Sequence, residues 1–177
     1  EQMLAQFPFE ILGFHADNGS EYVNHKVARL LDKLRIEFTR SRPRHSNDNG
    51  LAETKNGAVV RKEFGYEHIH RRHAARFDTF CREYLNPFLN YHRPCLFATE
   101  LADPKKPGRI KRVYRPRDVM TPLDKLASLP DAASFLRPGV TLLELQQLAR
   151  ALTDVQAAEE LNEARQALFR RAATRTG

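Results

Sequence analysis

The pattern of hydrophobic and polar positions over the first forty residues predicts two strands with a helix between them. A short, mostly apolar run at residues 9–14 has the length of a β-strand and stops at a polar cluster. Residues 36–40 alternate apolar and charged positions and predict a second strand. Between them, Asn24 is a suitable N-cap for a helix whose apolar positions recur at helical spacing: Val27, Leu30, Leu31 and Leu34. Strand, helix and strand in this order predict a parallel pair joined by a crossover.

The next part of the chain predicts one loop and two helices. Residues 41–50 are dense in Pro, Ser, Asn and Gly, which is typical of a loop. Residues 51–64 can form a helix capped by Asp48 or Asn49. Residues 76–89 predict another helix, which Pro87 should end or kink. Its aromatic stripe favours core packing against a sheet over base stacking; the stripe consists of Phe77, Phe80, Tyr84 and Phe88.

Two amphipathic helices are expected near the end of the chain. Leucines at 142, 143, 145 and 148 mark the first. Thr153 followed by Gln156 resembles a capping box that opens the second. The apolar stripe of this second helix is Val155, Ala158, Leu161, Ala164 and Leu168. We expect the two helices to form a small hairpin.

Charge is concentrated in one short stretch. The 177 residues carry a formal net charge of +7 and a pI of about 9.7, which favours a polyanionic partner. Residues 105–117 hold seven cations and no acid: Lys105, Lys106, Arg109, Lys111, Arg112, Arg115 and Arg117. The prolines and the glycine of this stretch argue against a helix. One interpretation of this stretch is a solvated linker or a localisation-like tract. The other is an extended arm that lies along DNA phosphates.

The lengths of the apolar runs and the spacing of the cysteines bear on whether the protein has a membrane partner and in which compartment it lies. No apolar run reaches the roughly 20 residues that a membrane-spanning helix needs, so no membrane partner is expected. Cys81 and Cys95 are 14 positions apart and form no CxxC motif, which fits a reducing cytoplasm.

Two acids stand out because of their setting. Asp17 follows the first predicted strand, and Glu53 lies at the start of the helix after the Asn-rich loop, with 35 residues between them. A carboxylate at a strand end and one on a helix can share hard divalent cations such as Mg²⁺. Two such ions about 4 Å apart can activate the attacking oxygen and stabilise the leaving oxygen of a phosphoryl transfer.

The residues around these acids resemble a known family. HADNGSEY around Asp17 and SRPRHSNDNGLAETKNG through Glu53 closely resemble the second and third acidic motifs of DDE transposases and integrases, which include insertion-sequence transposases and retroviral integrases. A gap of 35 residues between the last two acids is frequent in that family, and NYHRPC at residues 90–95 resembles a stretch that follows its glutamate. The resemblance covers about residues 7–100.

This resemblance implies an α/β, ribonuclease-H-like fold, of which the chain holds the C-terminal part of the core. It implies metal-dependent DNA cleavage and strand transfer, with Asp17 and Glu53 as catalytic ligands of Mg²⁺ or Mn²⁺. The partners it implies are transposon ends and target DNA, and a homo-oligomer for the full-length protein. We expect a core at residues 1–100, a basic linker at 101–118 and a helical region at 119–177. The expected DNA contacts are Arg40, Arg42, Arg44, Asn56, Lys105, Lys106, Arg109, Lys111 and Arg112.

The chain departs from the family in one respect. The family has a third, earlier acid, but only Glu1 and Glu10 precede Asp17 and neither fits that position. The expectation is therefore a core truncated at its N-terminal side, whose first strand exposes an unpaired edge. Such a chain should be poorly stable or dimerise through that edge, and should not transfer strands by itself.

Three other interpretations compete with a transposase core. His68, His70 and His73 invite a zinc site, but the paired close ligands of structural zinc sites are absent, so a basic surface segment is favoured. The chain can also be a non-catalytic DNA-binding or regulatory remnant, which the basic arm and C-terminal helices support equally well. The third interpretation is a nuclease with the same fold. The Asn-rich loop and the 35-residue spacing of the two acids argue against it.

Overall fold

The protein is described by a computed structural model, which defines residues 6–16, 23–42, 54, 56–106 and 108–173. The chain divides into two compact units, residues 1–69 and residues 70–177. The boundaries expected near residues 100 and 118 fall inside strands β3 (Cys95–Ala102) and β4 (Ile110–Met120). The stretch expected to be a linker is therefore built into an element of the second unit.

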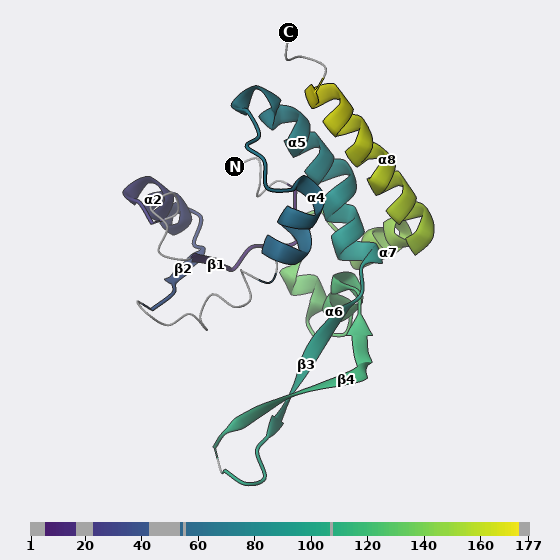
Figure 1. Cartoon of the computed structure of the whole chain (residues 1–177). Helices are drawn as coiled ribbons and strands as arrows, with labels where there is room; N and C mark the ends of the chain where they lie inside the picture. The colour runs from purple at the N-terminus through teal and green to yellow at the C-terminus, as the bar shows by residue number, and fades with distance from the viewer. Residues whose placement is uncertain (1–5, 17–22, 43–53, 55, 107, 174–177) are drawn as a thin grey trace. The chain divides into compact units, whose positions relative to one another are not determined.

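The first unit contains a parallel strand pair joined by a helix, as the sequence predicts (Figure 1). β1 (Gly13–Ala16) pairs with β2 (Glu37–Arg40), and α2 (His25–Lys33) connects them. Asn24 caps α2 by accepting hydrogen bonds from the backbone N–H groups of Lys26 and Val27, both at 3.0 Å. The apolar stripe of α2 is only partly buried, because Leu31 is buried whereas Leu30 and Leu34 are exposed.

The first strand lies later than the sequence pattern suggests. The apolar run predicts a strand at residues 9–14, but β1 begins at Gly13 and ends at Ala16. Its pairing with β2 explains the shift, since Phe14 lies opposite Phe38 with the two rings 6.0 Å apart. The small core of this unit consists of Ala16, Leu31 and Ile36. A helical segment follows later in the unit as a π-helix (Asn56–Arg61) and α4 (Lys62–Phe64), and it ends at Gly65 with φ +73°.

A long helix opens the second unit. A 3₁₀ turn (Arg71–His73) leads into α5 (Ala74–Phe80), and helical turns continue to His92 through π-type segments at Cys81–Leu85 and Phe88–His92. The sequence predicts that Pro87 ends or kinks this helix; it does not end it, and its backbone angles of −57° and −47° are helical. Widened turns on both sides of the proline accommodate its missing N–H. The helix stops where Arg93 becomes extended in front of Pro94.

Within the second unit, the aromatic stripe of this helix packs against another helix, where the sequence predicts packing against a sheet. Phe77 meets Phe169 of α8 (Asp154–Ala173) edge-on with 5.9 Å between ring centroids, and Phe80 stacks on Tyr84. Figure 1 shows α8 running alongside α5. Ala157, Leu161 and Leu168 are buried on α8, so Leu161 and Leu168 of the predicted stripe are confirmed, whereas Val155 at its beginning is exposed.

A smaller core holds the short helices of the second unit. Leu123 of α6 (Pro122–Ala127), Leu136 and Leu145 of α7 (Leu142–Arg150) are buried together, with Tyr91 packed against them. A 3₁₀ turn (Ala132–Phe135) connects α6 to α7. α7 and α8 are both present as predicted, and the Thr153–Gln156 capping box is confirmed. α8 packs against the long helix from Arg71 to His92. The predicted hairpin of α7 and α8 therefore does not describe the packing of this unit by itself.

Candidate nucleic-acid interface

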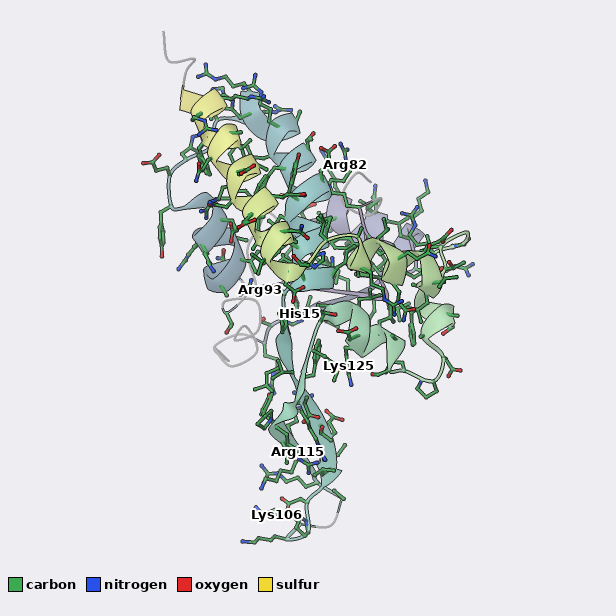
Figure 2. The ribbon with its side chains drawn as sticks, turned by 90° about the vertical axis from the view of Figure 1, so that its right-hand side faces the viewer. His15, Arg82, Arg93, Lys106, Arg115 and Lys125 are labelled. Carbon is green, nitrogen blue, oxygen red and sulfur yellow. The ribbon has the colours of Figure 1, made fainter. Side chains whose placement is uncertain are left out.

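The basic stretch forms the turn and most of the second strand of a two-stranded antiparallel ribbon, β3 and β4. Its turn is fixed by Asp103, whose carboxylate accepts a hydrogen bond from the Lys105 N–H at 2.9 Å, as in an Asx turn. The Asp103 N–H donates to the Arg109 carbonyl at 2.8 Å and closes the loop, while Gly108 supplies a left-handed residue with φ +82°. The local sequence thus holds Lys105, Lys106 and Arg109 at the exposed tip (Figure 2).

The cations continue from the tip along β4. Alternation along the strand places Ile110, Arg112 and Tyr114 on one face and Lys111 and Val113 on the other. Pairing is interrupted between Leu96 and Ala98, which lie opposite Val119 and Tyr114, so β4 bulges there. Pro116 lies in this bulge, where its lack of an N–H costs no ladder hydrogen bond. The ribbon therefore carries positive charge on both faces, with exposed apolar side chains between the cations: Leu101, Ile110 and Tyr114.

Few acids offset this charge. Glu100 accepts a hydrogen bond from Arg112 Nε at 3.0 Å, and both side chains are more than half exposed. An ion pair in that setting contributes only about 0–1 kcal/mol, so a phosphate can displace the carboxylate at little cost. Asp103 is engaged in the turn, and Asp118 accepts a hydrogen bond from Thr99 at 3.0 Å. The ribbon therefore keeps a net positive surface.

The base of the ribbon is attached to the helices of its unit. The side chain of His92, which is buried, donates from Nδ1 to Asp154 at 3.0 Å. Asp154 is the first residue of α8, where a carboxylate also interacts favourably with the helix dipole. Lys125 of α6 lies over the Phe97 ring, 5.9 Å from its centroid. The first contact ties the end of the long helix, just before β3, to α8, and the second ties β3 to α6.

The predicted catalytic acids, Asp17 and Glu53, and the predicted DNA contact Arg44 lie outside the described residues. In the sequence Asp17 follows Ala16, the last residue of β1, and Glu53 precedes the helical residue Thr54. Arg40 is the exposed last residue of β2, Arg42 is exposed two positions later, and Asn56 is exposed in its helical segment.

One polar cluster at the end of β1 does not follow from the sequence pattern. His15 Nδ1 lies 2.9 Å from Thr39 Oγ1, and His15 Nε2 lies 3.1 Å from the hydroxyl of Ser41, which is buried. Pairing of β1 with β2 in parallel register brings these three residues together. The sequence signal is the run of polar residues at both strand ends, but the register that joins them is a property of the sheet.

The histidine-rich segment has local structural roles. His70 Nδ1 accepts a hydrogen bond from the Arg72 N–H at 3.2 Å, and His73 Nε2 accepts one from Arg72 Nε at 3.1 Å. Within the described residues, no group of three His, Cys, Asp or Glu side chains could hold a metal ion. Cys81 and Cys95 are free and half-buried, and burial together with nearby Asp78 raises the pKa of the Cys81 thiol.

Comparison with known proteins is limited to part of the chain. An uncharacterized protein of Sinorhizobium fredii, y4rM, is 40% identical over 65 residues, which are 37% of this chain and 19% of that protein. The chain thus matches about a fifth of its relative's length. No family model matches the sequence, and no solved structure matches it. Over the part of the chain that the structure describes, no helix is long and apolar enough to cross a membrane.

Proposed function

We propose that this chain binds DNA as the C-terminal part of a DDE-type transposase or integrase core with a partial ribonuclease-H-like fold. The observation that carries the DNA-binding part is the ribbon of β3 and β4, which holds the seven cations of residues 105–117 on one protruding element (Figure 2). The transposase part rests on the motifs around Asp17 and Glu53 and on their place next to the β1–α2–β2 unit.

A ribbon of this kind suits double-stranded DNA in size and charge. The major groove is about 12 Å wide and admits a two-stranded β-ribbon. Lysines at the tip and arginines along β4 can contact phosphates on both sides of a groove, because cations lie on both faces of the ribbon. The exposed ring of Tyr114 adds an apolar surface between Arg112 and Arg115. Phosphate contacts dominate this arrangement, so it favours affinity over sequence selectivity.

The proposed cofactor is Mg²⁺ or Mn²⁺, and its ligands would be Asp17 and Glu53. Two carboxylates provide the hard oxygen donors that these ions prefer. When bound, the metal would stabilise charge on the attacking and leaving oxygens of a phosphoryl transfer. The parallel pair and its crossover support this part of the proposal, since Asp17 directly follows β1 in the chain. Titration with Mn²⁺ followed by electron paramagnetic resonance tests it: the Asp17→Asn/Glu53→Gln double variant should bind less Mn²⁺ than the Asp32→Asn/Glu159→Gln control.

A second candidate function is that of a non-catalytic DNA-binding or regulatory protein. The ribbon favours this function equally, because DNA binding by β3 and β4 needs no metal. Unchanged Mn²⁺ binding in the Asp17→Asn/Glu53→Gln variant, together with retained DNA binding, would favour it over the enzyme.

The DNA-binding proposal is tested by the salt dependence of affinity. The variant Lys105→Gln/Lys106→Gln/Arg109→Gln removes three cations from the ribbon tip without touching Asp103 or Gly108, which shape the turn. For duplex DNA, the slope of log affinity against log salt should become shallower by about 2.7, or 0.9 for each lost phosphate contact. The control Lys26→Gln/Arg82→Gln/Arg150→Gln removes the same charge from exposed helical positions. Equal slopes for the two variants would refute the ribbon as the DNA contact.

A further inference from the structure

A second group of arginines lies at the end of the helical pair that points away from the ribbon. There the beginning of the long helix meets the end of α8: Arg76 Nη1 donates to the Arg171 backbone carbonyl at 3.3 Å, and Phe77 packs on Phe169. Nitrogen-tipped side chains gather around this end in Figure 2. We call the exposed residues here the helix-end patch; they are Arg71, Arg72, Arg76, Arg170 and Arg171.

The composition of the two contributing segments is one-sided. Residues 68–77 and 164–173 contain six arginines and neither Asp nor Glu, and the nearest acids in the chain flank them at Glu67, Asp78 and Glu163. The two segments are almost a hundred positions apart in the sequence, so the antiparallel packing of α8 on the long helix creates the patch. The charge run of residues 105–117 belongs to a different element of the same unit.

Helix stability explains only part of this arrangement. Arg170 and Arg171 lie in the last turn of α8, where cations interact favourably with the helix dipole. Arg71, Arg72 and Arg76 lie at the opposite, positive end of the long helix, where cations are unfavourable. Bringing both sets together adds repulsion between like charges, which an anion at the patch would offset.

The pKa of His73, which lies within the patch, is affected by the same positive charges. Its side chain is buried, and Nδ1 is the one buried side-chain nitrogen or oxygen without a hydrogen-bond partner among the described residues. Desolvation lowers the pKa of His73, and the charges of Arg72, Arg76 and His70 lower it further. The charges of Arg72 and Arg76 therefore act on the His73 side chain within the patch.

We propose that the helix-end patch is a second phosphate-contact surface for duplex DNA, separate from the ribbon. This inference rests on the proposed DNA-binding function and adds a surface to it. The patch is exposed and consists of arginines, whose planar guanidinium groups match phosphate oxygens. Because all its members are arginines, it suits contacts with the DNA backbone.

The test compares two double variants of the full chain. Arg71→Gln/Arg170→Gln removes two cations from the patch and leaves Arg76 and Arg171, which tie the helices together, in place. The control Arg82→Gln/Arg150→Gln removes two exposed cations elsewhere in the same unit, one of them paired with Glu83. Affinity for duplex DNA is measured as a function of NaCl, and thermal melts establish that both variants are folded.

We expect the patch variant to bind more weakly, with a salt slope shallower by about 1.8 for two lost phosphate contacts, and the control to match the unmodified chain. Equal slopes for both variants would overturn the proposal. The Lys105→Gln/Lys106→Gln/Arg109→Gln variant separates the two surfaces. If that variant binds normally while the patch variant does not, the ribbon proposal fails and the patch stands; no binding by the unmodified chain overturns both.

Discussion

Replacement of Leu145 by alanine should destabilise the second unit strongly. Its side chain is 4% exposed and lies with Leu123 and Leu136 in the core that holds α6 and α7 together. Removing the three outer carbons of a buried leucine costs the lost transfer free energy and leaves a cavity, in total about 2–5 kcal/mol. We take about 3 kcal/mol, because three buried leucines make a small core whose half-buried neighbours, such as Tyr91, can relax partly into the space.

The resulting shift in melting temperature can be estimated from the size of the unit. For a unit of this length, residues 70–177, each kcal/mol corresponds to about 4 °C, so Leu145→Ala should melt about 12 °C lower. Leu143→Ala is the matched control, since Leu143 lies in the same helix and is 62% exposed. Thermal unfolding followed by far-ultraviolet circular dichroism measures both. A shift for Leu143→Ala as large as that for Leu145→Ala would refute the packing of α7 on Leu123 and Leu136.

Three further predictions concern helix ends. Thr153→Ala removes the N-cap of α8 and should cost about 1 kcal/mol in urea unfolding, whereas Thr153→Ser should cost much less; equal costs would contradict the capping box. Hydrogen bonds from the backbone and the side chain of Thr141 lower the pKa of Glu144, so its stabilising effect is complete above the unfolded-state pKa and is lost as pH falls through the folded-state pKa. Acid titration of unfolding free energy should therefore be flatter for Glu144→Gln, and an unchanged profile would count against the box. Gly65→Ala should destabilise by about 1–3 kcal/mol through its backbone angles alone (φ +73°, ψ −155°), because a Cβ there meets no atom within 4 Å, while a stabilising effect would refute this backbone conformation.

Local features of the fold are predictable because a few adjacent residues determine them. Asn24 identifies the start of α2, and Thr153 with Gln156 identifies the start of α8. The order strand, helix, strand with a parallel pairing follows from the spacing of apolar residues. The predicted beginning of β1 is wrong because pairing partners in β2, and not local apolar content, decide which residues join the sheet.

Long-range features are not predictable from local patterns. The ribbon has no clear sequence signal, because cations occupy both of its faces and hide the alternation that indicates a strand, while its prolines and glycine suggest an irregular linker. Pro87 predicts an end or a kink, and the helix does not end there because π-type turns allow it to continue. The contact between His92 and Asp154 joins residues 62 positions apart, and a single sequence contains no signal for it.

The same distinction between local features and long-range features applies to the candidate site. The composition of residues 105–117 is enough to indicate a polyanionic partner, and the fold adds the ribbon that presents these cations. The sequence indicates a basic segment around His68 to His73 but not the helix-end patch, because only the packing of α8 on the long helix joins its two segments.

The central claim is that DNA lies along the ribbon, and lysine footprinting tests it most directly. The unmodified chain is acetylated with and without duplex DNA, and the modified lysines are quantified by mass spectrometry. We predict protection of Lys105, Lys106 and Lys111, with Lys26 and Lys33 of α2 modified equally in both samples. Protection of the α2 lysines with full modification of the ribbon lysines would contradict the claim.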